Sequence, residues 1–323
     1  MLKSLIRNTL KIALLTLAAA GAAHAQDNKS MRLLVGFSAG GGTDQVARLF
    51  ANALQEELKQ TVIVENRTGA NGVIAIQELI KSPPDGNTIM ITINSLVTNE
   101  LMYKELPYTV KNDITPISLV STVPFVLTAN QNFPAKSVAE LIAHAKANPG
   151  KVTYGSAGVG SPPHLFQELF DQMAGIQTTH VPYRGSGPAV ADLLGGHIDL
   201  IWLTTLQAMP HLKEGRLHSF ALSSRERSDA VPDIPTLDEE GVKGYAADMW
   251  WGFVGPSGMP EDTLRKLEQA FRNVVASREI QEKLAELGSV PQGTTSEEFS
   301  AILTEENSKW EPLIRSLGIS LDK

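Results

Sequence analysis

Two glycine-rich turns carry the residues of this chain best suited to bind an anion. The first, residues 37–44, reads Phe-Ser-Ala-Gly-Gly-Gly-Thr-Asp, and the second, residues 154–161, reads Tyr-Gly-Ser-Ala-Gly-Val-Gly-Ser. Each joins an apolar strand pattern to an amphipathic helix pattern. A helix start offers unpaired backbone N–H groups and the positive end of the helix dipole, so it can bind an anion without Lys or Arg. Two such turns facing each other predict a clamp for a carboxylate.

The first turn does not match the known phosphate-binding loops. Gly42 is followed by Thr43 and Asp44, whereas the Walker motif requires Lys and then Ser or Thr there. Gln45 occupies the position of the third glycine of the dinucleotide motif. Asp44 suits a helix start, but its carboxylate would repel an anion unless it points away. The backbone of Asp44, rather than its side chain, is therefore the expected ligand contact. The alternative for the whole turn is a plain strand-to-helix connection without a ligand.

The second turn does not match a catalytic serine motif. A nucleophile elbow has Gly two residues before its Ser, but Tyr154 precedes Ser156 and Val159 precedes Ser161 at that spacing. His164 could donate a hydrogen bond to a ligand oxygen or cap the turn. The histidines show no His-Glu-x-x-His spacing and the chain has no cysteine, so no metal or other cofactor is predicted.

Two further side chains could contact an acid from outside the turns. Arg184 follows a strand pattern and precedes Gly185, which places both at the expected cleft edge. Its planar guanidinium can bind a second carboxylate through two N–H groups. An exposed rim position or an interdomain ion pair is the alternative. Ser95, after the third strand pattern, offers a hydroxyl donor.

The first 25 residues have the features of a secretory signal peptide. A basic start with three positive charges precedes the apolar residues 12–20, and residues 23–25 read Ala-His-Ala, so cleavage is expected after Ala25. The apolar stretch is shorter than the roughly 20 residues of a membrane span. No cysteine is present for lipid attachment. The sequence therefore predicts an exported, periplasmic protein.

The charge balance limits the classes of partner. The chain has 28 Lys and Arg against 35 Asp and Glu, a net charge of −7, and loss of three positive charges with the signal peptide leaves 25 against 35, or −10. This balance disfavours nucleic acid and anionic membranes. It allows an anionic ligand, because N–H groups in a dry cleft outweigh a diffuse and screened surface charge.

The order of strand and helix patterns predicts an α/β fold. Apolar runs of strand length alternate with amphipathic helix patterns, which favours mostly parallel sheets flanked by helices. A capping box at residues 137–140 predicts a helix start, and the chain from Pro260 onward reads as helices. Strand patterns lie at residues 31–37, 62–64, 89–91, 152–154, 180–183 and 199–203, and helix patterns at 46–58, 73–80, 165–170 and 188–194.

Two extended stretches, residues 117–128 and 249–254, predict crossover strands. They divide the mature chain into a discontinuous first domain, residues 27–124 plus 247–323, and a second domain, residues 125–246. Ligands of open α/β sheets bind at the carboxyl ends of the strands, so a cleft is expected between the two sheets.

The returning crossover carries Met249, Trp250 and Trp251. Side chains alternate along a strand, so one Trp is expected in the core and the other toward the cleft or the surface. Met249 and Trp250 are therefore candidate ligand contacts, and an aromatic wall there would suit an aromatic or long apolar acid.

Seven short segments occur in an order typical of one protein family. Together they closely resemble the substrate-binding proteins of tripartite tricarboxylate transporters, also called Bug proteins, over essentially the whole mature chain. The resemblance implies a type II, two-domain Venus-flytrap periplasmic binding protein that passes a carboxylated solute to a permease with a large and a small membrane subunit. The segments are Gly-Gly-x-x-Asp after the first strand pattern, Val-Glu-Asn-Arg-x-Gly-Ala-x-Gly at 64–72, Pro-Pro-Asp-Gly at 83–86, Gly-Ser-Ala-Gly-x-Gly-Ser-x-x-His-Leu at 155–165, Val-Pro-Tyr-Arg-Gly at 181–185, Asp-Leu-Leu-Gly-Gly at 192–196 and Pro-Asp-Ile-Pro-Thr at 232–236.

The resemblance also implies ligand contacts. In that family backbone N–H groups and ordered waters of the first turn, together with the second turn, hold the ligand carboxylate. Where many members have an Asp that is read as a partner for an amino group, this chain has Leu203-Thr204-Thr205, which disfavours an amino-acid ligand and leaves an uncharged wall. The complete set of expected contacts is Phe37, Ser38, Ala39, Gly40, Gly42, Thr43, Asp44, Ser95, Ser156, Ala157, Gly158, Ser161, His164, Arg184, Gly185, Thr204, Met249 and Trp250.

These observations predict a monomeric periplasmic receptor, not an enzyme, for a small organic acid. A dicarboxylate, aliphatic or aromatic, would bridge the two turns and favour a closed form that the permease recognises. An exported hydrolase or isomerase of a carboxylated substrate is one alternative. A ligand-sensing receptor for a membrane kinase is another.

Overall fold

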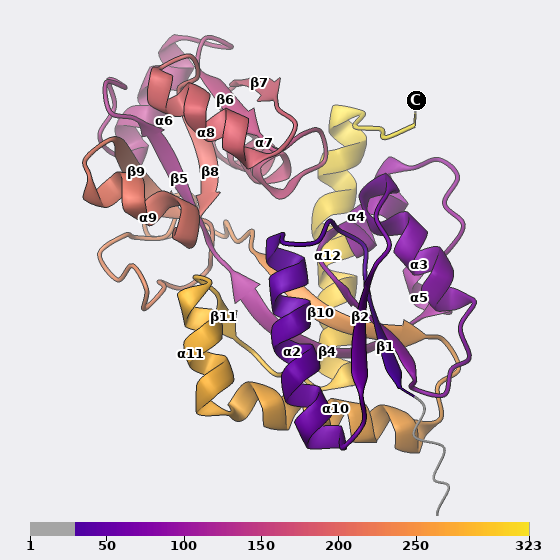
Figure 1. The fold of residues 1–323 in the computed structure, drawn as a ribbon. Helices are drawn as coiled ribbons and strands as arrows, with labels where there is room; N and C mark the ends of the chain where they lie inside the picture. Colours follow the sequence, from indigo (N-terminus) through magenta and orange to yellow (C-terminus); the bar gives the residue numbers. More distant parts are fainter. Residues whose placement is uncertain (1–29, 323) are drawn as a thin grey trace, which may run out of the picture.

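The computed structural model describes residues 30–322, so the predicted signal peptide, residues 1–25, lies outside the described residues. The chain forms two mixed β-sheets, each flanked by helices (Figure 1). The strand order is β11-β4-β10-β3-β1-β2 in the six-stranded sheet and β7-β6-β8-β5-β9 in the five-stranded sheet. We call these sheets with their helices the first lobe and the second lobe. The predicted α/β, two-domain fold class is confirmed.

The first lobe takes its elements from both ends of the described chain. Its strands are β1 (Met31–Val35), β2 (Val62–Asn66), β3 (Thr88–Thr92), β4 (Ile114–Val123), β10 (Met249–Pro256) and β11 (Val290–Pro291). Its helices are α2 (Gly42–Leu58), the short η1 (Ala70–Gly72), α3 (Val73–Ile80), α4 (Ser95–Met102), α5 (Val110–Asp113), α10 (Glu261–Ala276), α11 (Arg278–Glu286) and α12 (Ser296–Leu317).

The second lobe is built from the middle of the chain. Its strands are β5 (Phe125–Asn130), β6 (Thr153–Ser156), β7 (Thr179–Pro182), β8 (Leu200–Thr204) and β9 (Leu217–Leu222). Its helices are α6 (Val138–Ala147), α7 (Pro162–Ala174), α8 (Ser186–Gly195) and α9 (Thr205–Lys213). Among all the residues that the structure describes, no helix is both long and apolar enough to cross a membrane.

The prediction of mostly parallel sheets is wrong. β1 pairs in parallel with β2 and β3, and β6 does so with β7 and β8, as the alternation of strands and helices predicts. However, β10 is antiparallel to β3 and β4, and β5 is antiparallel to β8 and β9. The antiparallel pairs arise because β4–β5 and β10 belong to segments that run from one lobe into the other.

The chain passes between the lobes at the two predicted extended stretches. Pro124 separates β4 in the first sheet from β5 in the second, and because proline has no N–H group it interrupts the strand there. The chain returns through residues 246–248 into β10. The domain limits, with changes after residues 124 and 246, remain a prediction.

Helices cover both faces of the first sheet. On one face Phe50 of α2 packs against Phe253 of β10 and Phe271 of α10, with ring centroids 5.2 and 6.1 Å from that of Phe50. On the other face Phe299 of α12 packs against the sheet beside α3 and α4. The long helix α12 then runs toward the second lobe (Figure 1), where Trp310 stacks on Phe166 of α7 at a centroid distance of 6.1 Å.

The expectation that one tryptophan of β10 faces the cleft or the surface is wrong. Trp250 is 2% exposed and Trp251 is 4% exposed. Their side chains do alternate, but β10 is an interior strand with helices on both faces, so each side enters a core. Trp251 donates from its indole nitrogen to Thr43 Oγ1 at 3.2 Å, and Trp250 packs edge-on against Phe299 at 5.3 Å.

The predicted capping box at residues 137–140 is half formed. The hydroxyl oxygen of Ser137 accepts a hydrogen bond from the Glu140 N–H group at 3.2 Å. The Glu140 carboxylate accepts from the Lys136 N–H group at 2.7 Å instead of from Ser137. The helix still starts where predicted, because one side-chain acceptor satisfies an N–H group of its first turn.

Candidate ligand-binding site

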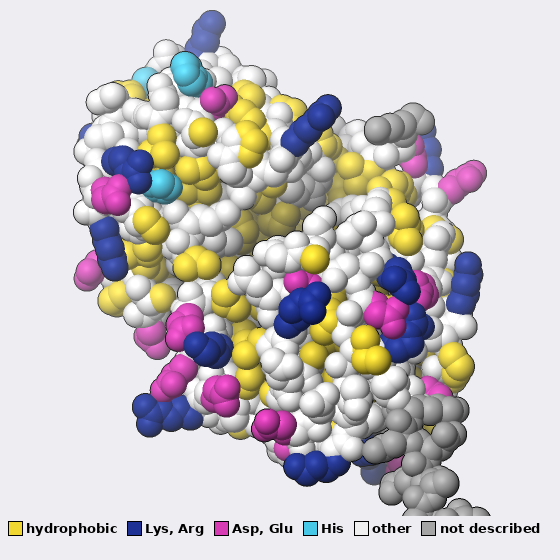
Figure 2. Space-filling view, viewed as in Figure 1, with side chains coloured by type: hydrophobic (Ala, Val, Ile, Leu, Met, Phe, Trp, Pro, Cys, Tyr) yellow, Lys and Arg dark blue, Asp and Glu magenta, His cyan; other side chains and the backbone are white. Residues whose placement is uncertain are grey.

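A cavity of about 310 Å³, which we call the interlobe cavity, lies between the two lobes. Figure 2 shows a hollow between the lobes with largely hydrophobic side chains inside it. All the lining residues are described, and none of their side chains is charged. They are Phe37, Asn71, Ile93, Asn94, Ser95, Thr98, Ala157, Gly160, Ser161, Pro162, Leu165, Phe166 and Trp310.

The first lobe contributes a cluster of neutral polar groups at the start of α4. The side-chain amide of Asn94 donates to the Glu306 carboxylate at 2.8 Å and accepts from the backbone N–H group of Trp250 at 3.2 Å, so it is held in place. The Ser95 hydroxyl is hydrogen-bonded to no other described group, and it lines the cavity with Thr98. Ser95 is therefore a ready donor for a ligand oxygen.

Asn71 lines the cavity in the left-handed backbone conformation. Its φ is +52° and ψ is +37°, and asparagine adopts this conformation more readily than other residues with a side chain. The conformation is held by Asn99, which accepts from the Asn71 amide at 2.9 Å and donates to the Asn71 carbonyl at 3.2 Å. These two hydrogen bonds with Asn99 fix Asn71 in one wall of the cavity.

The first turn is supported by the side chain of Asp44. This buried carboxylate accepts from the Gly40 N–H group at 2.9 Å, from Arg48 at 3.0 Å and from Asn66 at 2.9 Å. Burial alone would raise the pKa of Asp44, but these hydrogen bonds and the charge of Arg48 hold the pKa down at about 2. The carboxylate thus stays ionised while it is turned into the protein, and it takes up one N–H group of the turn.

Most of the first turn does not line the interlobe cavity. Only Phe37 does so, whereas Ser38, Ala39, Gly40 and Gly42 are exposed on the protein surface. Thr43 is buried and accepts the hydrogen bond from Trp251. The free N–H groups of this turn therefore lie beside the cavity rather than in its wall.

Side chains beneath the surface, those of Ser156, His164 and His180, fix the second turn in place. The hydroxyl oxygen of Ser156 accepts from the Gly158 N–H group at 3.0 Å and lies 2.6 Å from His180 Nε2. His164 Nδ1 accepts from the Gly160 N–H group at 3.1 Å. The two imidazoles stack with centroids 4.0 Å apart. His164 therefore caps the turn, which was one of its two predicted roles.

Both histidines are neutral in the folded protein. Burial, with a smaller contribution from His180, lowers the pKa of His164 to about 3, and burial lowers the pKa of His180 to about 4. A neutral His164 whose Nδ1 accepts a hydrogen bond carries its proton on Nε2, which lies 3.9 Å from the Glu168 carboxylate. Its donor is thus directed toward Glu168.

The second turn offers fewer N–H groups than predicted. The N–H groups of Gly158 and Gly160 are taken by Ser156 and His164, and α7 begins with two prolines, Pro162 and Pro163, which have no N–H group. Among the described residues the N–H group of Ala157 has no acceptor. With the Ser161 hydroxyl, which already donates to the Gly158 carbonyl at 2.7 Å, it forms the polar part of this wall.

The remaining predicted contacts lie outside the interlobe cavity. Arg184 is exposed and forms no hydrogen bond or ion pair with another described residue. Gly185 precedes α8 with a φ of +104°. Thr204 caps α9 in a reciprocal capping box with Gln207. Met249 begins β10, and Trp250 lines a different cavity.

Sequence reasoning missed several residues of the cavity wall. Asn71 occupies an unspecified position of the segment 64–72, and Asn94 directly precedes the predicted Ser95. Thr98 lies one helical turn later on α4. Trp310 comes from a helical tail that shows no binding motif. Of these residues, only Asn71 had a signal in the sequence, because it lies between Gly69 and Gly72, which mark a break between strand and helix patterns.

A comparison with protein families shows that the chain is a solute-binding receptor. The model of the tripartite tricarboxylate transporter family receptor matches residues 46–319. The chain belongs to this family. The family is one of solute-binding receptors rather than enzymes.

Solved structures of similar proteins agree with this assignment. Rpa4515 of R. palustris, solved with adipate, is 33% identical with a TM-score of 0.78 over 90% of this chain and 98% of that one. MatC of Rhodopseudomonas palustris, solved with bound malate, is 29% identical with a TM-score of 0.74 over 88% and 98%. The periplasmic binding protein BugD is 31% identical with a TM-score of 0.74 over 90% and 98%. The chain therefore has the fold of a periplasmic binding protein.

Proposed function

We propose that this receptor binds a small dicarboxylate in the interlobe cavity, in the periplasm, and delivers it to a tripartite tricarboxylate-type transporter with a large and a small membrane subunit. The observation that carries the proposal is that both lobes contribute neutral polar groups to the cavity wall, together with apolar side chains. Ser95 and Thr98 face it from one lobe, and Ala157 and Ser161 from the other. A ligand with a carboxylate at each end matches this arrangement.

The electrostatics of the cavity support an acid held by neutral donors. Hydrogen bonds to a charged acceptor are worth about 1.5–3 kcal/mol each, so a few donors suffice where water is excluded. Phe37, Leu165 and Trp310 offer apolar contacts to the body of the ligand. A volume of about 310 Å³ is at the lower end of the range for small-molecule sites. Two similar proteins were solved with adipate and malate, both of them dicarboxylates.

A hydrolase is the less favoured function. The contact between Ser156 and His180 has the length of a nucleophile–base pair, but Ser156 is completely buried and its hydroxyl is engaged by Gly158. A substrate carbonyl therefore has no path to this hydroxyl. The pair holds the turn rather than a reacting group.

Calorimetric titration of the mature protein with adipate and with hexanoate tests the proposal. Hexanoate has the same chain length and only one carboxylate. The protein is unfolded and refolded first, so that any ligand retained from the cell is removed. We expect adipate to bind at least about tenfold more tightly, because each carboxylate adds hydrogen bonds to charged oxygen. Equal affinity for both acids would show that the cavity does not recognise two carboxylates. Malate and terephthalate then separate short aliphatic from aromatic ligands.

Transport is tested in cells. Deletion of the gene should abolish uptake of the bound acid, and a variant that does not bind it should fail to restore uptake. Normal uptake in the deletion strain, together with a lost transcriptional response to the acid, would instead support a sensory receptor.

A further inference from the structure

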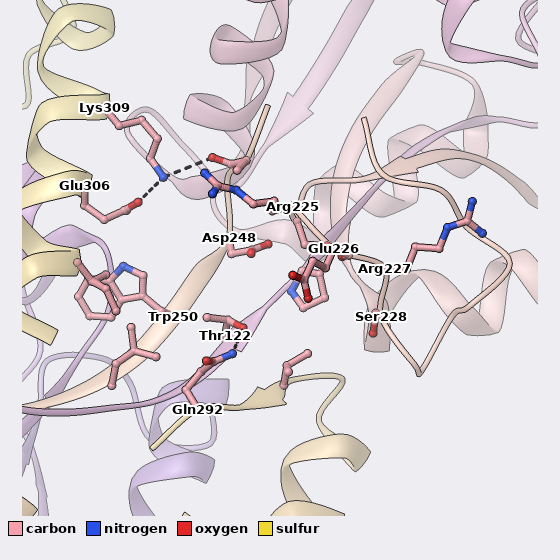
Figure 3. Close-up of a pocket in the computed structure, with 16 residues that line it drawn as sticks. Thr122, Arg225, Glu226, Arg227, Ser228, Asp248, Trp250, Gln292, Glu306 and Lys309 are labelled. Carbon is pink, nitrogen blue, oxygen red and sulfur yellow. Dashed lines mark hydrogen bonds and ion pairs between the residues drawn. The ribbon is translucent and has the colours of Figure 1, made fainter. Parts of the chain in front are cut away.

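A second cavity, which we call the hinge cavity, lies where the chain passes between the lobes. Its volume is about 320 Å³, and its wall includes Pro124 of the outgoing segment, Asp248 and Trp250 of the returning segment, and Lys309 of α12 (Figure 3). It shares no lining residue with the interlobe cavity. The molecule therefore has two separate cavities at its lobe junction.

Trp250 lines the hinge cavity and carries an unused hydrogen-bond donor. Its indole nitrogen is buried and has no hydrogen-bond partner among the described residues. In Figure 3 this nitrogen lies on the side of the ring that faces Glu306 and Asp248. A buried donor without an acceptor costs about 1–3 kcal/mol, and such groups are rare in folded proteins. A molecule in the cavity that supplies an acceptor would remove this cost.

Asp248 presents a carboxylate that forms no ion pair with a described residue, although the charge of Lys309 acts on it from nearby. Ser223 donates to its Oδ1 at 3.2 Å, but no Lys, Arg or His among the described residues forms an ion pair with it. The adjacent Lys309 is occupied, because it pairs with Glu306 and donates to the Ala246 carbonyl at 3.4 Å. Burial raises the pKa of Asp248 to about 6. The cavity thus offers a site for a cationic group.

Arg225 presents a guanidinium at the same cavity. It lies on the loop after β9, is exposed, and forms no hydrogen bond or ion pair with a described residue. Guanidinium groups bind carboxylates through two parallel N–H groups. Leu119, Val290 and Ile302 add apolar surface to the wall. Opposite charges and an apolar surface therefore border one space.

We propose that the hinge cavity binds a small zwitterion, a molecule that carries both an ammonium group and a carboxylate, with an apolar side chain. Its ammonium group binds Asp248, and its carboxylate accepts from the Trp250 indole and from Arg225. This site is independent of the proposed function, because none of its residues lines the interlobe cavity.

Calorimetric titration of the mature protein with L-leucine tests the proposal. Two matched probes accompany it: 4-methylpentanoate, which lacks the ammonium group, and 3-methylbutylamine, which lacks the carboxylate. We expect leucine to bind at least about tenfold more tightly than either probe, since each loses hydrogen bonds between charged groups. No binding of leucine would mean that only water fills the hinge cavity. Equal binding of all three would mean that the cavity does not recognise the ammonium group and the carboxylate together, and either result would overturn the proposal.

Variants locate the bound leucine. We expect Asp248→Asn and Arg225→Gln each to weaken leucine binding by about tenfold. Arg225 is exposed, so its variant tests the site even if Asp248→Asn fails to fold. Ser95→Ala in the interlobe cavity is the control and should leave leucine binding unchanged. If Ser95→Ala weakens leucine binding and Arg225→Gln does not, leucine occupies the interlobe cavity and the proposal is wrong. Adipate titrations of the same variants report separately on the proposed function.

Discussion

The two glycine-rich turns have similar sequences, but the first lies at the surface and the second rests on buried side chains. In the first turn the glycines are exposed, and a single carboxylate, that of Asp44, holds the Gly40 N–H group. In the second turn Ser156 and His164 bond to glycine N–H groups, and His180 packs against both. Similar glycine patterns therefore form one exposed turn and one turn that several side chains fix in place.

The difference shows how neighbouring residues decide what a glycine-rich turn can bind. α2 begins with Gly42 and Thr43, which keep their N–H groups, whereas α7 begins with Pro162 and Pro163, which have none. The second turn is a preformed wall of the interlobe cavity. The first turn holds its N–H groups beside the cavity rather than in its wall.

The largest effect is expected for Gly160→Val in the fixed turn. Gly160 has a φ of +76°, and a Cβ there would lie 2.7 Å from Met102 Sδ of the first lobe. The added side chain would displace the Met102 side chain and, with the backbone strain at a φ of +76°, distort the turn that lines the cavity. We expect adipate affinity to fall by about a hundredfold, equal to about 2.8 kcal/mol, as measured by calorimetry.

A matched control separates this collision from backbone strain. Gly175 at the end of α7 has a φ of +63°, and a Cβ added there would meet no atom of a residue beyond its chain neighbours within 4 Å. Gly175→Val carries the same kind of strain away from the cavity, so it should lower the melting temperature but keep adipate affinity. Equal loss of affinity in both variants would contradict a fixed second turn.

A smaller effect is expected when single hydroxyl donors are removed. The Ser95 hydroxyl has no partner among the described groups, so Ser95→Ala should weaken adipate binding by about tenfold. The Ser161 hydroxyl already donates to the Gly158 carbonyl at 2.7 Å, so Ser161→Ala should weaken it less. A larger loss for Ser161→Ala would reverse this ranking and show that its hydroxyl turns toward the ligand.

The fixed turn should make stability depend on pH in the mildly acidic range. His164 and His180 have folded pKa values of about 3 and about 4, below the ordinary 6.5. Between pH 6.5 and about 4 the unfolded chain binds protons at these positions and the folded protein does not, so these groups lower stability as the pH falls. In a plot of melting temperature against pH, His180→Gln should reduce the slope between pH 6.5 and about 4. Asp171 and Asp248, with raised pKa values of about 6, act in the opposite direction, and the comparison with wild type removes their contribution.

The smallest effect is expected on acid unfolding, when the Asp44 carboxylate of the first turn is removed. Asp44 has a folded pKa of about 2 against an ordinary 3.8, so its contribution to stability is present above about pH 4 and is lost as the pH falls toward 2. Asp44→Asn should remove that acid-dependent loss, and Arg48→Gln should remove part of it. An unchanged acid unfolding curve in Asp44→Asn would mean that the turn does not need its carboxylate.

Local patterns were enough to place most elements of the fold. Strand patterns such as residues 31–37 and helix patterns such as 73–80 became β1 and α3, because burial of one face imposes a period that is visible along the chain. The antiparallel pairing of β10 was not visible. Strand direction depends on which segments meet in the sheet, and those strands are far apart in the sequence.

The candidate site was predictable in position but not in detail. Both turns border the gap between the lobes, and Ser95 and Ser161 line the interlobe cavity. Asn71 was not predicted, because it occupies an unspecified position of the segment 64–72. Trp310 was not predicted, because its neighbours along the chain carry no binding motif. Trp250 was expected near the cleft and lines the hinge cavity instead.

Sequence alone determined the element order, the two glycine-rich turns and the family, because each depends on residues that are close in the chain or recur in a set order. Tertiary structure alone decided which N–H groups stay free. Ser156 meets His180 across 24 positions, and Asn94 meets Glu306 across 212. A hydrogen-bonding group is available to a ligand only if no distant segment has already satisfied it, and folding brings those segments together.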